Sequence, residues 1–153
     1  MVRLSDTPAS LRHHLEALEC PRCEHTPCVS GPPLAERRVA VISTAGLQQR
    51  GDRPFGLGAA DYRVIRGDTA AADIVMSHIS TNFDRSGFQQ DINVVFPLER
   101  LREMADAGEI GSVAEFHYSF MGSTAPEQMA PVIDQLAPLL HADGVDAILL
   151  APV

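Results

Sequence analysis

Three cysteines and a histidine lie close together near the N-terminus, and their side chains are among the most reactive in the sequence. They form the pattern Cys20-x-x-Cys23, followed by His25 and Cys28. Such ligands can hold Zn²⁺ in a tetrahedral site, and a CxxC pair can instead cycle between dithiol and disulfide. Zinc modules usually pair two such knuckles across a longer loop, which this sequence lacks. A redox-active CxxC usually lies at the start of a helix that follows a strand, and no strand is expected before this one. A zinc site, a redox pair and a chemically inert arm stay open. The spacing favours the inert arm, so we predict no metal ligands.

Two histidines in the middle of the chain are candidates for proton transfer. His78 follows an apolar segment, and Asp84, Asp91 and Asn93 come after it. A histidine with carboxylates near the end of a strand can transfer a proton or bind a metal. A structural role for His78 is equally consistent with the pattern. His117 lies in an aromatic segment, where a place in the core is the simpler interpretation.

Small and hydroxyl-bearing residues follow the first expected strand. Ser43, Thr44 and Gly46 lie in this turn, where hydroxyls and backbone N–H groups could receive an anion. Arg63 would add a positive charge. A plain strand-to-loop turn is the simpler interpretation. The glycine-rich segment Gly51–Gly58 lacks the GxGxxG pattern and is more simply explained as a surface loop.

Composition excludes several classes of function. The formal charge is −8, from 20 acidic and 12 basic residues, and every basic residue is arginine. The lack of lysine excludes lysine Schiff-base chemistry and a Walker lysine. The acidic balance and the absence of tryptophan argue against binding to nucleic acids or to anionic membranes. Neither a membrane span nor a signal-peptide core is recognisable, so we expect a cytoplasmic protein.

Hydrophobic patterning predicts alternating strands and helices after a short N-terminal helix capped by Ser5 or Asp6. Short, β-branched or aromatic segments predict strands at Arg38–Ser43, Ile74–Ile79, Phe116–Phe120 and Val145–Leu150, with Ile92–Phe96 as a further strand or extended segment. Helical spacing predicts a helix over Pro97–Ala107. It also predicts one opened by a capping box at Thr124-x-x-Glu127 and bent or broken at Pro131 and Pro138.

This order of elements predicts an α/β fold. We expect a three-layer sandwich with a mostly parallel sheet, Rossmann-like or flavodoxin-like. Residues 1–33 are expected to form a helix and a Cys/Pro-rich arm, and residues 34–153 the α/β domain. In such sheets ligands bind beyond the carboxyl ends of the strands. The sequence stops at that point after its last strand, so we expect the domain to be incomplete at its C-terminus.

Several short motifs together resemble one known protein family. In order they are VISTAG (41–46), DYRVI (61–65), MSH (76–78), DINVVFP (91–97), GEIG (108–111), HYSFMG (117–122) and GVDAIL (144–149). Together they resemble the selenoprotein B component of the glycine, sarcosine, betaine and D-proline reductases, and especially its short stand-alone relatives. The resemblance covers roughly residues 34–153.

The resemblance implies a nucleophile that this sequence does not contain. In the family, the strand similar to Val145–Leu150 leads into a selenocysteine or cysteine. We therefore expect the sequence to be truncated at a selenocysteine codon directly after Val153, and the 153-residue form to be inactive. A selenocysteine or cysteine is thus expected in the full-length protein, and no bound cofactor.

These arguments predict a thiol- or selenol-dependent oxidoreductase. It would act on a small amino-acid-like substrate with a dithiol/disulfide redox partner protein, without nucleic acid or membrane partners, and it could form a homo-oligomer. The alternatives are a non-catalytic module that binds a small anion and a zinc-bearing interaction protein. The predicted residues are His78, Asp91 and His117 as supporting catalytic groups, and Ser43, Thr44, Gly46 and Arg63 for substrate binding.

Overall fold

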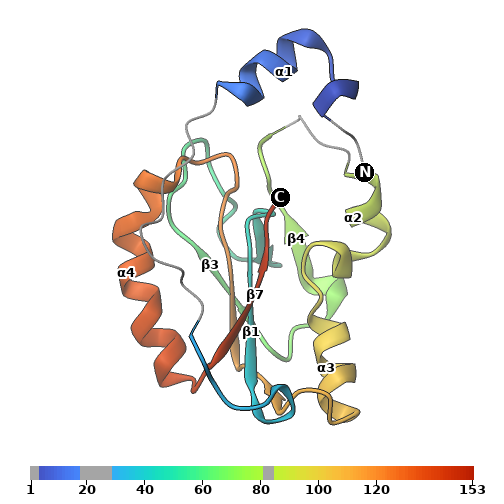
Figure 1. Cartoon of the computed structure of the whole chain (residues 1–153), viewed down its shortest axis with the longest axis vertical. Coiled ribbons are helices and arrows are strands. Elements are labelled where there is room, and N and C mark those ends of the chain that lie inside the picture. The colour runs from blue at the N-terminus through green and yellow to red at the C-terminus, as the bar shows by residue number, and fades with distance from the viewer. Residues whose placement is uncertain (1–3, 18–28, 81–84) are drawn as a thin grey trace. The chain divides into compact units, whose positions relative to one another are not determined.

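The computed structural model describes residues 4–17, 29–80 and 85–153 and divides into two compact units, Met1–Ser30 and Gly31–Val153 (Figure 1). The first unit holds a 3₁₀ helix, η1 (Leu4–Asp6), and one α-helix, α1 (Ala9–Glu16). The predicted N-terminal helix is confirmed, but it begins after Pro8 rather than at Ser5 or Asp6. All other described elements belong to the second unit.

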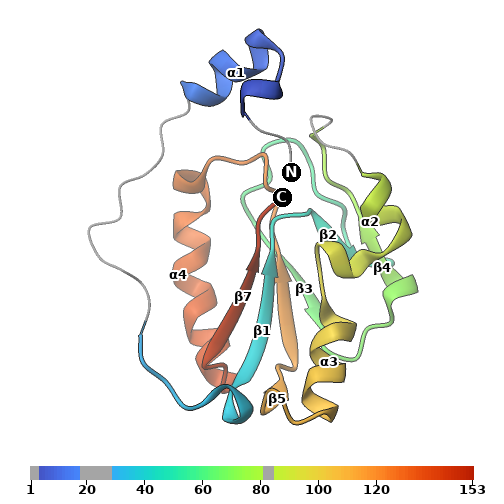
Figure 2. The ribbon, with the colours of Figure 1, turned by 45° about the vertical axis from the view of Figure 1, so that its right-hand side comes forward.

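A mostly parallel sheet forms the centre of the second unit. Its central strand is β1 (Arg38–Ser43), whose apolar sequence suits a strand buried on both faces. β7 pairs along β1, while β5 pairs with its first residues and β6 with its last, all three in parallel (Figure 2). β3 closes the sheet antiparallel to β6. The bounds are β3 (Arg63–Arg66), β5 (Ser112–Val113), β6 (Phe116–Ser119) and β7 (Ala147–Ala151).

A second, smaller sheet continues from the end of β1. β2 (Leu47–Gln49) pairs antiparallel with β4 (Ile74–Met76), so that Leu47 lies opposite Met76. The pairing brings the segment after β4, which contains His78, back towards the turn after β1. Short helices fill the connections: η2 (Leu34–Glu36), η3 (Ala71–Asp73), α2 (Ser86–Gln90) and η4 (Ile92–Val94).

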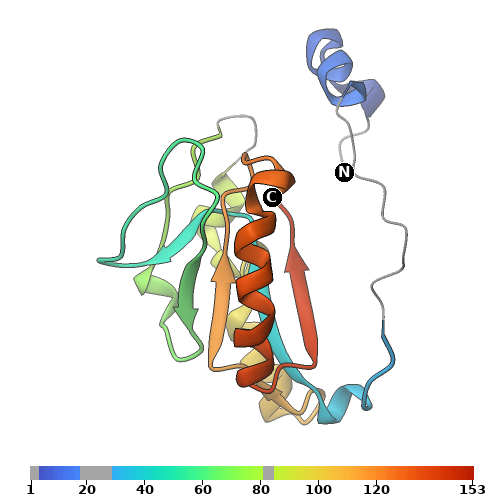
Figure 3. The ribbon, with the colours of Figure 1, turned by 90° about the vertical axis from the view of Figure 1, so that its left-hand side faces the viewer.

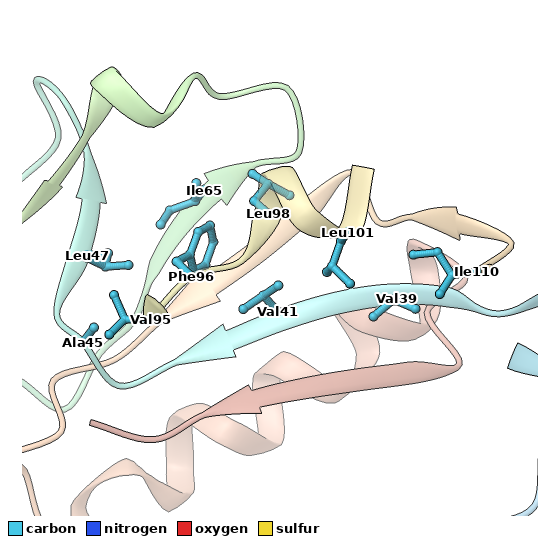
Figure 4. Packing of buried hydrophobic residues seen from close by; sticks show 10 residues of the cluster. All are labelled: Val39, Val41, Ala45, Leu47, Ile65, Val95, Phe96, Leu98, Leu101 and Ile110. Atoms are coloured by element: carbon cyan, nitrogen blue, oxygen red, sulfur yellow. The ribbon is translucent and has the colours of Figure 1, made fainter. Parts of the chain in front are cut away.

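Helices cover both faces of the main sheet. α3 (Leu98–Asp106) and α4 (Pro126–Ala142) lie on opposite faces (Figure 3). The larger apolar cluster lies between α3 and the sheet, and Figure 4 shows its side chains spread along β1, from Ala45 and Leu47 past Phe96 to Val39 and Ile110. The smaller cluster contains Tyr118, Phe120 and Leu136 and lies beneath α4. The prediction of an α/β fold with a mostly parallel sheet is therefore confirmed.

Several predicted elements differ from the structure. Ile92–Phe96 is not a strand, because Asp91 caps a 3₁₀ turn there by accepting a hydrogen bond from the Asn93 N–H group. The predicted capping box is also wrong, since Thr124 donates its hydroxyl hydrogen to the Ala59 carbonyl and α4 begins without a side-chain cap. α4 runs unbroken past both internal prolines.

β7 is a parallel strand with little cover. It pairs only with β1 among the strands that the structure describes. Its three central residues, Ile148, Leu149 and Leu150, are 46%, 39% and 67% exposed. Parallel strands are normally covered by helices on both faces, so these exposures are unusual.

No helix in the described ranges combines the length and the apolar character needed to cross a membrane.

Candidate functional site

The carboxyl ends of β1, β6 and β7 meet at one edge of the sheet (Figure 2). Hydrogen bonds tie the three chains together just beyond the strands. The Thr44 N–H group donates to the Ala151 carbonyl at 3.1 Å, and the Thr44 carbonyl accepts from the Gly122 N–H group at 2.9 Å. We call this meeting point the strand-end junction and define it by Ser43–Gly46, Ser119–Gly122 and Ala151–Val153. Ligands of open α/β sheets bind at such an edge.

A threonine hydroxyl links β1 to the segment after β7. Thr44 Oγ1 accepts a hydrogen bond from the Val153 N–H group at 2.8 Å and donates to the Val153 carbonyl at 3.2 Å. The backbone of Gly122 packs closely against both residues. A Cβ atom at Gly122 would lie 2.4 Å from the Val153 carbonyl oxygen and 2.9 Å from that of Thr44. Only glycine therefore fits here without a backbone shift.

The turn after β1 uses its own hydrogen-bond donors. Its four consecutive N–H groups donate within the protein, two to serine hydroxyls and two to carbonyls: Thr44 to Ala151 O (3.1 Å), Ala45 to Ser43 Oγ (3.2 Å), Gly46 to Phe120 O (2.9 Å) and Leu47 to Ser119 Oγ (2.8 Å). An anion bound here would have to displace some of these bonds. The turn thus has an internal role in the structure, which is to hold the strand-end junction together.

His78 lies directly against this turn. Gly46 has a φ of +65°, and a Cβ atom there would lie 3.0 Å from the His78 Cα atom. The Ser77 N–H group donates to the Gly46 carbonyl at 2.9 Å, and this bond holds the segment of His78 against the turn after β1. His78 is 4% exposed, and its Nδ1 atom accepts from the Ser80 N–H group at 3.2 Å. Burial, together with the nearby Arg85, lowers the pKa of His78, so the ring is neutral at pH 7.

Sequence comparison identifies the family to which this arrangement belongs. The model of the glycine/sarcosine/betaine reductase selenoprotein B family matches residues 22–153. The chain belongs to this family. The match includes every residue of the strand-end junction, and it confirms the resemblance found in the motifs.

Curated proteins similar to this chain are named as subunits of amino-acid and betaine reductases. The chain is 33% identical over 123 residues to the D-proline reductase subunit gamma of Acetoanaerobium sticklandii, covering 76% of this chain and 49% of that protein. It is 28% identical over 122 residues to the betaine reductase complex component B subunit beta of Peptoclostridium acidaminophilum, covering 76% of this chain and 28% of that protein. The chain thus spans about half or less of the curated relatives it matches. No solved structure matches it.

Of the other predicted residues of this reductase-family chain, His117 lies in the core. It is fully buried in β6, and its Nδ1 atom accepts a hydrogen bond from the Val41 N–H group at 2.9 Å. Burial is the main reason that the pKa of His117 is lowered to about 4. Nε2 is buried and makes no hydrogen bond of good geometry among the described residues. The nearby Ala114 carbonyl nevertheless acts to raise the pKa of His117, against the larger effect of burial. A supporting catalytic role for His117 stays a prediction.

Asp91 is placed on the surface rather than at the strand-end junction. It is exposed, and its carboxylate accepts hydrogen bonds from the N–H group and the side-chain amide of Asn93 at 2.9 and 2.8 Å. These bonds lower the pKa of Asp91. Within the described residues, the side chain therefore acts as the cap of η4. Its supporting catalytic role also stays a prediction.

Arg63 holds the long loop before β3. It is 6% exposed, pairs with Asp61 at 2.9 Å and donates to the Arg53 carbonyl at 2.7 Å. Its guanidinium group also lies over the Phe55 ring, 4.3 Å from the centroid. These contacts use the charge within the loop, so they do not by themselves support the predicted role in substrate binding.

Sequence reasoning missed two residues of the junction, Ser119 and Gly122. Both lie in the HYSFMG motif, which was the available signal. In the described ranges, no three histidine, cysteine or acidic side chains gather in a way that could hold a metal ion. Cys20, Cys23, His25 and Cys28 lie outside the described residues, as does Asp84.

Proposed function

We propose that this chain is part of a thiol- or selenol-dependent reductase that acts on a small amino-acid-like substrate. The observation that carries the proposal is the family match over residues 22–153, which spans the whole strand-end junction. Its relatives are subunits of a D-proline reductase and of betaine and glycine reductase complexes, which supports a substrate with an amine group next to a carboxylate.

The strand-end junction is the proposed place of the chemistry. The reactive species would be a thiolate or selenolate, since the anion is the nucleophile. The described residues hold no thiol, because all three cysteines lie between residues 20 and 28. We propose that a selenocysteine or cysteine of a longer polypeptide is presented at this edge of the sheet. The greater length of the curated relatives is consistent with that arrangement.

The proposed reaction is a two-electron reduction. The thiolate or selenolate attacks the carbon atom that carries the amine, and the carbon–nitrogen bond breaks with its electron pair going to the nitrogen. One thiolate of a dithiol then attacks the sulfur or selenium of this adduct, the bond to carbon breaks, and the carbon takes up a proton. The second thiol of the dithiol displaces the original thiolate or selenolate from the mixed disulfide or selenosulfide, so the dithiol ends as a disulfide. Neutral His78 is suited to move a proton in this scheme, because its lowered pKa leaves it uncharged at pH 7. The dithiol would belong to a redox partner protein.

The alternative of a non-catalytic module that binds small anions has less support. Its predicted donors, the N–H groups after β1, all donate within the protein. Arg63, its predicted positive charge, is paired with Asp61. An anion at this turn would therefore gain few new hydrogen bonds.

Three finer predictions accompany the proposal. The presence of α3 and α4 on opposite faces of a mostly parallel sheet supports a three-layer, Rossmann-like or flavodoxin-like domain. A cytoplasmic location also stays a prediction, and so does a homo-oligomer.

Turnover by the native gene product tests the proposed function. The protein would be purified from its source with any polypeptides that copurify and mixed with a dithiol and D-proline, sarcosine, betaine or glycine. We expect one of these amines to cause oxidation of the dithiol. His78→Ala should reduce the rate at least about tenfold, whereas His141→Ala, an exposed position on α4, should not. Amine binding by calorimetry without dithiol oxidation would favour the anion-binding alternative.

A further inference from the structure

One edge of β1 has a gap between its two neighbours. β5 pairs with Arg38 and Val39, and β6 pairs only from Ile42 onwards. The last backbone bond to the β5 side is the one that the Val39 carbonyl accepts from the Ala114 N–H group at 2.9 Å. Val41 lies on β1 between the residues that pair with β5 and those that pair with β6, and it is fully buried. Its N–H group would be left without a partner if only strand pairing were available, and such buried groups are nearly always satisfied.

An imidazole ring takes the place of the missing strand. The Nδ1 atom of His117 accepts the hydrogen bond of the Val41 N–H group at 2.9 Å. The ring packs edge-on against Phe96, with the centroids 5.9 Å apart. The turn at Gly67 lies beside Nε2: a Cβ atom at Gly67 would lie 3.5 Å from Nε2 and 2.4 Å from the Ala114 carbonyl oxygen. The hydrogen bond to Val41 and the contacts with Phe96 and the Gly67 turn therefore restrict the orientation of the ring.

Only the neutral ring can act in this way. Nδ1 accepts a hydrogen bond when the proton is on Nε2, and a doubly protonated ring can only donate. The charged groups near the ring have opposite effects on the pKa of His117. Asp143, at the end of α4, favours the charged form, and Arg102 of α3 and Arg38 of β1 oppose it. Burial outweighs them and keeps the pKa of His117 low.

The strand that carries His117 also carries a residue of the junction. Ser119 follows two residues later, pairs with Ser43 and accepts the Leu47 N–H hydrogen bond at 2.8 Å. A shift of β6 along β1 would break that bond and open the turn after β1. We propose that His117 is a positioning residue, whose imidazole replaces a strand in the β1 ladder and thereby fixes Ser119 against the turn. The inference concerns geometry and does not depend on the reaction proposed above.

The tautomer of His117 in the unmodified protein is the first test. Long-range ¹H–¹⁵N correlation spectra at pH 7 distinguish a ring protonated at Nε2 from one protonated at Nδ1. We expect His117 to carry its proton on Nε2 and to show the Nδ1 shift of a hydrogen-bond acceptor. A proton on Nδ1 would overturn the proposal, and this measurement needs no variant to fold.

Two amide substitutions provide the second test. In His117→Asn the side-chain oxygen can occupy the place of Nδ1, whereas in His117→Gln the amide group lies at the place of Nε2. We expect the Asn variant to keep slow hydrogen exchange at both the Val41 and the Leu47 amides. In the Gln variant both should exchange at least about tenfold faster, because Val41 loses its acceptor and Ser119 is no longer fixed.

Hydrogen exchange at the Val41 and Leu47 amides distinguishes a positioning role of His117 from one in which its ring only fills space in the core. Equal protection of the Val41 amide in the two variants would contradict the proposal. So would loss of protection at Val41 with that of Leu47 unchanged, because Ser119 would then be placed without His117. If the Gln variant does not fold, fast exchange of the Val41 amide in the Asn variant would overturn the proposal by itself.

Discussion

Replacing His117 by asparagine should make the protein less sensitive to mild acid. The pKa of His117 is about 4 in the folded protein, against the ordinary value of 6.5. Between these two pH values the unfolded chain binds a proton at this position and the folded chain does not. The free energy of unfolding therefore falls as the pH drops below about 6.5, and it stops falling on this account near pH 4. Above about pH 7 the contribution of His117 is fully present.

The size of the effect follows from the difference between the two pKa values. Each unit of pKa corresponds to about 1.4 kcal/mol, so the whole transition is worth about 3 kcal/mol. Between pH 7 and pH 5 the proton-binding equilibria give a loss of about 2 kcal/mol. Because His117 is fully buried, little of this effect is screened by solvent. His78 also has a lowered pKa and adds to the loss in the same direction.

Urea unfolding at pH 7, 6 and 5 would measure this dependence. The loss of unfolding free energy from pH 7 to pH 5 should be about 2 kcal/mol smaller in His117→Asn than in the unmodified protein, because asparagine does not titrate. His141→Asn, at an exposed position on α4, should leave the dependence unchanged. Equal losses in the unmodified protein and in His117→Asn would refute the assignment of this acid sensitivity to the buried imidazole.

Three further substitutions should change stability measurably by urea or thermal unfolding. Gly122→Ala should cost about 1–3 kcal/mol, because its methyl group would meet the Val153 carbonyl; an unchanged melting temperature would contradict the close approach. Asp143→Ala should cost about 2 kcal/mol, since the carboxylate pairs with Arg38 at 2.5 Å and is largely buried; the loss should persist in 1 M salt. Leu136→Ala should cost about 2–5 kcal/mol, and a loss below 1 kcal/mol would show that the cluster beneath α4 packs loosely.

The elements that the sequence predicted well are those whose pattern depends on burial alone. Arg38–Ser43 is a run of mostly apolar, β-branched residues, and it forms β1 with the predicted bounds. β3 was not predicted, because it begins and ends with arginine. The charge of Arg63 is neutralised by Asp61 and that of Arg66 by Asp68, which is visible only once the chain is folded. Short strands between charged residues give little hydrophobic signal.

The candidate site was predictable only in outline. The rule that ligands bind at the carboxyl ends of parallel strands directed attention to the turn after β1, although a binding role for that turn stays a prediction. Which other strand ends lie beside it depends on the pairing of β1 with β6 and β7, and the order of strands is not encoded in local patterns. Gly122 therefore had no recognisable role in the sequence. His117 gave a signal for chemistry, although its clearest contact is with a backbone amide.

The exposure of β7 has a consequence for the behaviour of the protein in concentrated solution. β7 carries three consecutive aliphatic residues and no charged residue or proline. Charges and prolines on an edge strand usually prevent strands of different molecules from pairing, and β7 lacks both. Such an edge acts as a template for precipitation when unfolded or partly folded chains are abundant, for example during overproduction. A single lysine at Leu150, the most exposed of the three, would introduce a gatekeeper charge into a sequence that has no lysine of its own. We therefore expect Leu150→Lys to raise the concentration at which the 153-residue chain precipitates.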